Sequence, residues 1–381
     1  MEKFSPSRKQ SKKQLTDFVE NDLKDYSFRR NYDYGINNRD NISCLSPYIS
    51  HGVIQEKEIL KKCLDKHSYG VIEKFIQEVL WRNYWKGWLE LRPSLWQDYL
   101  KDLQDLENQK INNSNYLKAI SGNTSIECFN DWVIELKKNH YLHNHTRMWF
   151  ASIWIFTLKL PWQLGAEFFM KYLFDGDPAS NTLGWRWVAG IQTIGKHYLA
   201  SSSNINKYTN NKYRDIPLEN HANAITSDKS YSAEKLNLKN TQLNDVNEII
   251  VFDNYLAVEE DNLCNLNLRK VYLVENNNNH RIIKLDEDVV KFKKELLIDQ
   301  ANRLKDKNID YEIIQIDELK LLSNVEYAYY PTIGENLDFI TNNNIENLNF
   351  VYRDIDLLAW PYCEKGFFNF KKNIPTVLKN I

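Results

Sequence analysis

Two acids, an amide and an indole stand close together in the segment DGDPASNTLGWRW, residues 175–187. Asp177 precedes Pro178, and an acid followed by proline is a common start of a helix. Asn181 and Trp185 are four residues apart, so they share one face of that helix. Two ionised carboxylates in a buried loop need cations or hydrogen-bond donors. The segment therefore predicts a polar site where a helix begins.

A second segment supplies a partner for these acids. In HNHTRMWFAS, residues 143–152, Asn144, Arg147 and Met148 fall on one helical stripe. We expect Arg147 to pair with Asp175, because a guanidinium can satisfy a carboxylate with two hydrogen bonds. A plainer reading remains open, in which the acids only cap a helix and bind this arginine.

Two further segments have the same mixed character. FIQEVLWRNYW, residues 75–85, places Glu78, Trp81 and Arg82 on one helix face, whereas a core face would be apolar throughout. NISCLSPYIS, residues 41–50, offers hydroxyls and backbone N–H groups ahead of a helix, which suit a phosphate. Taken one at a time, the tryptophans of these segments are more often core packing than functional groups.

The elements that must hold these segments are predicted to be helices. Ten of the eleven tryptophans lie within residues 81–187, in long apolar-periodic stretches with few Gly or Pro. Residues 201–246 are polar and predict a linker or an irregular wrap. After residue 247, short β-branched runs alternate with the amphipathic segment 289–309, which favours a small parallel-sheet α/β domain.

Length and charge set the broad class. For 381 residues we expect two domains, over 1–205 and 247–381, joined by a polar linker over 206–246. The formal net charge is -2, so nucleic-acid binding would require basic residues grouped on one face. No apolar run approaches the ~20 residues of a membrane span, and the N-terminus lacks a secretory h-region. We expect a cytoplasmic monomer.

No metal site is predicted. The five cysteines are scattered without a CxxC pair, which argues against zinc and against a disulfide framework. His143 and His145 are two residues apart, so they point to different helix faces, and no acid or cysteine completes a ligand set.

In this order, the four segments resemble the FAD-binding domain of the DNA photolyase/cryptochrome family. The family has a TSxLSPYL-like phosphate loop, a WREFY-like helix, a HNRxRM-like helix and a DGDxAxNxxxWxW segment. This sequence has ISCLSPYIS, LWRNYW, HNHTRM and DGDPASNTLGWRW, and the resemblance covers roughly residues 20–205. It implies a mostly α, photolyase-like helical domain that binds FAD, followed here by the smaller α/β parallel-sheet domain.

The resemblance also implies roles at the cofactor. Asp175, Gly176 and Asp177 would lie against the isoalloxazine, with Arg147 balancing Asp175 and with Asn181 opposite flavin N5. The remaining implied cofactor-binding residues are Tyr26, the loop residues Ile42, Ser43, Cys44, Leu45 and Ser46, and Phe75 and Tyr141, which stand where many members have flavin-facing tryptophans. The family usually has Thr and Arg where this chain has Ile42 and Cys44, so a hydroxyl and a charge are lost.

The implied activity is that of a deoxyribodipyrimidine photo-lyase, a carbon–carbon lyase that acts on pyrimidine dimers in UV-damaged DNA. In the family, light-excited reduced FAD donates an electron, the cyclobutane ring splits, and the electron returns. The flipped dimer stacks on aromatic side chains. The implied catalytic residues are Glu78, Asn144, Met148, Asn181, Trp185 and Trp162, and the implied DNA-binding residues are Arg30, Glu78, Trp81, Arg82, Asn144 and Trp187.

Three points in the resemblance stay open. Trp185 and Trp162 match the first two members of the family's tryptophan relay, but the third has no clear match, and Tyr116, Trp154 or Trp149 are candidates. The α/β segment follows the FAD domain instead of preceding it, which suggests a circularly permuted order and room for a second, antenna chromophore. The alternative functions are a photosensory cryptochrome without repair, and a degenerate member that has lost FAD.

Overall fold

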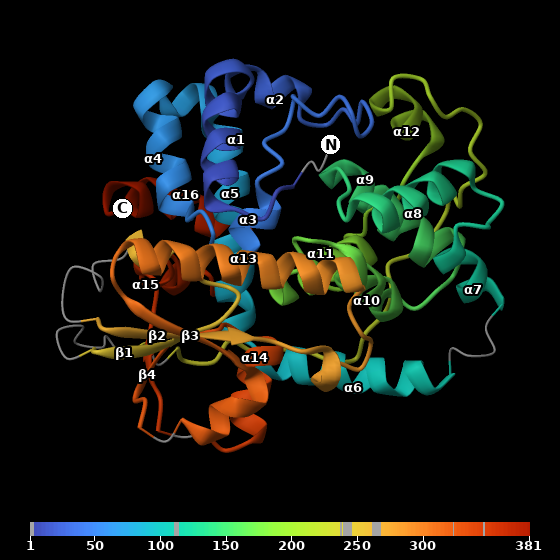
Figure 1. Cartoon of the computed structure of the whole chain (residues 1–381). Helices are drawn as coiled ribbons and strands as arrows, with labels where there is room; N and C mark the ends of the chain where they lie inside the picture. Colours follow the sequence, from blue (N-terminus) through green and yellow to red (C-terminus); the bar gives the residue numbers. More distant parts are fainter. Residues whose placement is uncertain are drawn as a thin grey trace.

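The computed structural model describes residues 4–381 except 110–113, 237, 239–245, 261–267, 323 and 346. The first half of the chain is helical (Figure 1). Its α-helices are α1 (Arg8–Asn21), α2 (Tyr26–Arg29), α3 (Ser46–Ser50), α4 (Glu56–Lys66), α5 (Tyr69–Glu90), α6 (Pro93–Gln109), α7 (Ser114–Ser121), α8 (Glu127–Asn139), α9 (Asn144–Ser152), α10 (Trp162–Tyr172), α11 (Pro178–Ala189) and α12 (Ser202–Tyr208). Among the described residues, no helix is both long and apolar enough to cross a bilayer.

Helix α5 is the central element of the helical part. It has 22 residues, and buried side chains lie on most of its circumference, which is typical of a helix surrounded by protein. Helices α2, α4, α11 and α16 all contact it. The segment at residues 75–85 therefore lies in a helix that is packed against four other helices.

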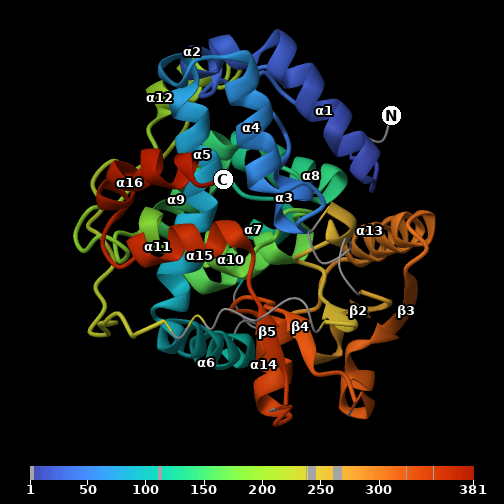
Figure 2. The same cartoon turned by 90° about the vertical axis from the view of Figure 1, so that its left-hand side faces the viewer.

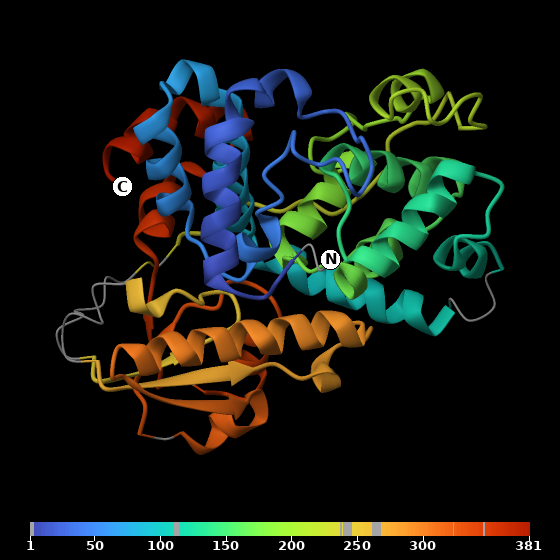
Figure 3. The ribbon, with the colours of Figure 1, turned by 45° about the horizontal axis from the view of Figure 1, so that its top comes forward.

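The second half contains a sheet of five parallel strands in the order β3-β2-β1-β4-β5. The strands are β1 (Glu248–Val251), β2 (Lys270–Glu275), β3 (Asp310–Gln315), β4 (Tyr327–Tyr329) and β5 (Asn349–Val351). Alternate residues of β1 enter different cores: Ile249 packs on the side of α13 (Glu287–Asp306), and Ile250 packs with Phe339 of α14 (Glu335–Asn342). Figure 3 shows α13 lying along one face of the sheet. The predicted strands, the helix and the mostly α-then-α/β fold are confirmed.

The polar segment between the two halves lies against the helical part. The backbone N–H of Ile225 donates to Ala189, at 3.0 Å, and that of Glu234 donates to Leu91, at 2.8 Å. Apolar side chains of this segment, including Ile216 and Leu218, pack on the core. Of the two sequence readings, the irregular wrap is the one that describes these residues.

The chain returns to the helical part at its C-terminal end. Helices α15 (Asp354–Ala359) and α16 (Phe367–Lys379) lie against α5, as Figure 2 shows. The approach is close at Gly87, where an added Cβ would lie 2.6 Å from the Trp360 ring. Glycine suits this crossing, because a Cβ would displace Trp360 and Cys363, which follow α15.

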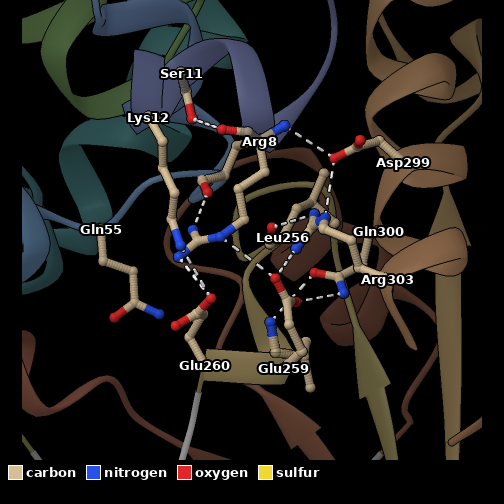
Figure 4. Close-up of polar contacts among 12 residues, drawn as sticks. Arg8, Ser11, Lys12, Gln55, Leu256, Glu259, Glu260, Asp299, Gln300 and Arg303 are labelled. Atoms are coloured by element: carbon tan, nitrogen blue, oxygen red, sulfur yellow. Dashed lines mark hydrogen bonds and ion pairs between the residues drawn. The ribbon is translucent and has the colours of Figure 1, made fainter. Parts of the chain in front are cut away.

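A polar cluster centred on Arg8 joins α1 to the α/β part (Figure 4). The Arg8 side chain is 4% exposed and forms ion pairs with Glu58, with Glu259 at 3.4 Å and with Glu260 at 3.2 Å. Arg303 of α13 also binds Glu259. Buried Arg8 and partly exposed Arg303 are thus matched by acids from both parts, and this cluster joins α1 to α13.

Candidate cofactor and substrate site

The loop that precedes α11 contains two buried acids. Arg147 of α9 donates from Nη2 to Oδ2 of Asp175, at 2.9 Å, which is the ion pair expected from the sequence. Burial alone would raise the pKa of Asp175, but Arg147, Arg82 and the Ser46 hydroxyl outweigh it, so the net pKa lies below its usual value. Asp175 is therefore held ionised inside the helical part.

Asp177 caps α11, as its place before Pro178 predicts. Its Oδ1 accepts from the backbone N–H of Ser180, at 2.7 Å, and its Oδ2 lies 3.6 Å from Nζ of Lys86. Burial would raise the pKa of Asp177, but Lys86, Arg82 and the Ser180 N–H lower it below the usual value. Both acids of the DGD segment are thus kept charged by cations from α5 and α9.

The loop at residues 42–46 leads into α3 and brings that helix to the same acids. The Ser50 hydroxyl donates to the Asp175 backbone carbonyl, at 3.0 Å, and Arg82 donates to the same hydroxyl oxygen. Cys44 has a φ of 50°, a left-handed conformation that is uncommon for a side chain of this kind. Contacts among described residues therefore join all four sequence segments at Asp175 and Asp177.

The Asn181 side chain has a hydrogen-bonded amide nitrogen and an amide oxygen that is open to a ligand. Its Nδ2 donates to the Ala166 carbonyl, at 2.8 Å, which leaves Oδ1 as an acceptor on a partly exposed side chain. One turn further along α11, a Cβ placed on Gly184 would meet no atom within 4 Å. The face of α11 that carries Asn181 therefore borders open space.

Phe75 and Tyr141, which the resemblance places at the flavin, also have aromatic and cationic neighbours within the protein. Phe75 is packed between the rings of Phe18 and Tyr26, each with its centroid 5.2 Å away. Tyr141 has the guanidinium of Arg147 5.1 Å from its ring and lines a cavity of about 820 Å³ beside α13, which neither DGD acid lines. Phe75 belongs to the core, and Tyr141 supports the cation that pairs with Asp175.

Glu78, one turn before Arg82 on α5, is held by α2. Arg30 binds one carboxylate oxygen and the Tyr26 hydroxyl donates to the other. Desolvation raises the pKa of Glu78, and Arg30 and Tyr26 offset only part of that effect. Glu78 therefore has Arg30 and Tyr26 as its partners. The family resemblance implies that Arg30 meets DNA phosphate and that Tyr26 meets the FAD phosphates.

The other residues predicted on the substrate side are accessible. Trp81, Met148 and Trp187 are partly exposed, and Asn144 is exposed at the start of α9. Trp187 also stacks on Tyr198, with ring centroids 5.9 Å apart. An aromatic and polar surface on α5, α9 and α11 is therefore available to a ligand from solvent.

The relay tryptophans have different neighbours. Trp185 is buried and meets Trp154 edge to face, with ring centroids 6.2 Å apart, and Trp154 in turn meets Tyr116 at 6.0 Å. Trp162 stacks on Tyr99, at 5.5 Å. Of the three candidates for the unmatched third member, Trp154 and Tyr116 are the two that connect to Trp185 through ring contacts.

Sequence reasoning missed Lys86, Ser50 and Ser180. Lys86 is eight residues after Glu78 in α5, and its 3% exposed side chain is a charge that burial requires to be paired. An i, i+4 step from Arg82 to Lys86 on one helix face was the signal that could have found it. The two serines gave no comparable signal, because hydroxyls are common on helices.

The residues fit an FAD molecule. Oδ1 of Asp175 and Oγ of Ser180 are buried and have no hydrogen-bond partner of normal geometry among the described residues. Such orphaned atoms are rare in a native fold unless a ligand or water meets them. Ser180 shares α11 with the Asn181 acceptor and with Gly184, beside which there is open space, so this helix offers polar groups to a cofactor.

Comparison with known proteins agrees with this site. Residues 75–221 match the family model described as the FAD binding domain of DNA photolyase. The chain is 32% identical over 182 residues to a deoxyribodipyrimidine photo-lyase of Buchnera aphidicola, covering 45% of this chain and 37% of that protein. It is 27% identical over 191 residues to the Vibrio cholerae protein of the same name, covering 49% and 40%.

Among solved structures, a Synechocystis cryptochrome is similar over 54% of this chain and 44% of its own, with 23% identity and a TM-score of 0.46. The chain matches 40% and 37% of the length of these two curated relatives, about two fifths of each. The matched segment contains Glu78, Arg147, both DGD acids and Asn181. Residues 75–221 therefore resemble the FAD binding domain of DNA photolyase, and FAD is the cofactor that this similarity indicates.

Proposed function

We propose that this protein repairs cyclobutane pyrimidine dimers in DNA in a light-driven reaction of its FAD. One observation carries the proposal: Glu78 and Arg82 lie one turn apart on α5, about 6 Å along the helix axis. Arg82 faces the acids of the cofactor site, and Glu78 is presented with the partly exposed Trp81 on the solvent side. One rigid helix thus links a flavin site to a lesion site.

The chain's own residues have definite tasks in this scheme. When bound and reduced, FAD supplies an electron to the dimer on illumination. The Glu78 carboxylate has lone pairs left after binding Arg30 and Tyr26, so it can accept from pyrimidine imide N–H groups. Trp81 and Trp187 supply the flat surfaces on which an extruded base can stack.

The named relatives support the proposal. Three curated proteins that are similar over 40–49% of this chain are named deoxyribodipyrimidine photo-lyase. The proposed partner is UV-damaged DNA.

Replacing Glu78 by glutamine is expected to slow dimer repair about ten-fold or more while FAD stays bound. The amide cannot accept two imide N–H groups as the carboxylate can, and a hydrogen bond to a charged group contributes about 1.5–3 kcal/mol. Repair per flash of a dimer-containing oligonucleotide measures the effect. Glu73→Gln on the same helix is the control, since Glu73 forms a surface pair with Lys371 at 3.2 Å. Equal repair by Glu78→Gln and wild type would place the substrate elsewhere.

Replacing Trp185 by phenylalanine is expected to slow light-driven reduction of the oxidised cofactor at least ten-fold. Phenylalanine keeps the packing against Phe169 and Trp154 but is far harder to oxidise than an indole. Trp149→Phe is the matched control, because Trp149 stacks on Trp132, at 5.7 Å. Bleaching of the flavin absorption under light measures both. A normal rate in Trp185→Phe would require a different donor.

A photosensory cryptochrome without repair activity is the second candidate. Repair is weakened by Ile42, Phe75 and Tyr141, which differ from the residues that many family members have there, and by the near-neutral net charge of -2. A protein that binds FAD, is photoreduced and leaves dimers intact would support this alternative over the first.

We also infer that the two parts of the chain stand in circularly permuted order. The sheet order β3-β2-β1-β4-β5 with α13 and α14 on opposite sides is a complete parallel α/β unit that follows the helical part. The division into 1–205, 206–246 and 247–381 goes with this inference. An experimental structure with the α/β part packed elsewhere than the antenna position of relatives would contradict it.

A further inference from the structure

The C-terminal helix reaches the substrate side of α5. Phe367, the first residue of α16, stacks on the indole of Trp81 with ring centroids 3.6 Å apart and an interplanar angle of 22°. Phe367 is 8% exposed, whereas Trp81 remains partly exposed. Phe367 therefore covers one face of the Trp81 indole, and a ligand can contact only the part of the indole that is exposed to solvent.

The contact is anchored rather than loose. Phe370 and Ile374, on the same side of α16, are fully buried. The Tyr84 hydroxyl donates to the Lys365 carbonyl, at 3.1 Å, and Arg92 donates to the Glu364 carbonyl, at 2.7 Å. Moving α16 away would expose this apolar surface and break both hydrogen bonds. Phe367 is thus a fixed wall and not a cover that lifts.

A fixed aromatic wall has a consequence for stacking. Tryptophan has rotatable side-chain bonds, and a base can stack on it only in the orientation that presents the flat face. Parallel packing against Phe367, with Tyr84 and Trp85 at the edges, removes that freedom before any ligand arrives. Preorganisation of this kind lowers the entropic cost of binding.

We propose that Phe367 is a positioning residue for lesion recognition: it backs Trp81, so that an extruded pyrimidine adds as the next layer of an existing aromatic stack. The proposal rests on the proposed repair function and deepens it. Phe367 lies outside residues 75–221, the segment that matches the photolyase FAD-binding family. The C-terminal helix therefore completes a site that the helical part alone does not contain.

The test compares Phe367→Leu with Phe370→Leu in the full-length, FAD-loaded protein. Both substitutions replace a buried ring by an aliphatic chain in the same helix. Phe367 stacks on Trp81, whereas Phe370 packs on Phe367 and on Tyr84, with the Phe370 and Tyr84 ring centroids 5.5 Å apart. The readout is the ratio of dissociation constants for an undamaged and a dimer-containing oligonucleotide, measured in the dark by fluorescence anisotropy. We expect Phe367→Leu to lower this ratio about three- to ten-fold, on the scale of one lost aromatic pair. Phe370→Leu should keep it.

Phe367→Tyr keeps the ring and should restore the ratio. Each further outcome has a definite meaning. An unchanged ratio in Phe367→Leu, with wild-type protein that prefers the dimer, would overturn the positioning role alone. Tighter dimer binding by Phe367→Leu would show that the ring obstructs the site and would also overturn it. A wild-type protein with no preference for the dimer would contradict the proposed function itself, and the positioning role with it.

Discussion

Replacing Asp177 by alanine is expected to yield a folded protein that purifies with little or no FAD. Asp177 has two tasks, as the N-cap of α11 and as the partner of Lys86. Loss of the cap costs about 1 kcal/mol, and the Lys86 cation, 3% exposed, is left without its nearest acid. The start of α11 carries Ser180 and Asn181, so a frayed first turn removes the atoms that we assign to the cofactor. The measurement is the ratio of FAD to protein after denaturation.

The control for Asp177 is an aspartate that caps a different helix. Asp286 caps α13 and accepts from the backbone N–H of Asp288, at 3.2 Å. Asp286→Ala should cost about the same 1 kcal/mol in helix capping while FAD occupancy stays full. Asp177→Asn separates the two tasks, because an amide still caps a helix but does not balance Lys86. Full FAD occupancy in Asp177→Ala would show that this acid does not lie at the cofactor.

Arg8→Met is expected to lower the free energy of unfolding by about 3–5 kcal/mol, the usual cost of removing one partner from a buried charge network. Arg8 faces Glu58, Glu259 and Glu260 at once, and the Glu259 side chain is only 5% exposed. Methionine keeps much of the side-chain volume, so the loss is mainly electrostatic. Urea unfolding followed by tryptophan fluorescence measures it.

Lys12→Met is the matched control for Arg8. Lys12 is on the same helix and pairs with the same Glu260, at 3.2 Å, but its side chain is 49% exposed. A surface pair of this kind contributes no more than about 1 kcal/mol. If Arg8→Met and Lys12→Met were equally mild, the cluster in Figure 4 would not be what holds α1 against α13.

Much of the fold follows from local pattern. The strands and α13 were predictable because apolar periodicity reports which face of an element is buried. The Asp177–Pro178 pair predicted the start of α11, since capping is a property of neighbouring residues. The pairing of Arg147 with Asp175 followed from charge balance in a buried loop. These features depend on short stretches of chain.

The remaining features depend on packing between distant segments. The ion pair of Arg30 with Glu78 could not be predicted, because α2 lies against α5 in a way that no local pattern specifies. The packing of Phe75 between Phe18 and Tyr26 likewise joins three separate helices. The stack of Phe367 on Trp81 joins residues that are far apart in the sequence, so helical periodicity could not predict it.

Light-dependent repair by the wild-type protein is the most direct test of the proposed function. The purified protein, with FAD bound and reduced by an external reductant, is mixed with an oligonucleotide that contains one cyclobutane thymine dimer. Matched samples are kept in blue light and in the dark, and the intact and repaired strands are separated by chromatography. The arrangement of Glu78, Trp81 and the DGD acids predicts repaired strand in the light and none in the dark. Intact dimer in both samples, with FAD bound and photoreducible, would contradict it.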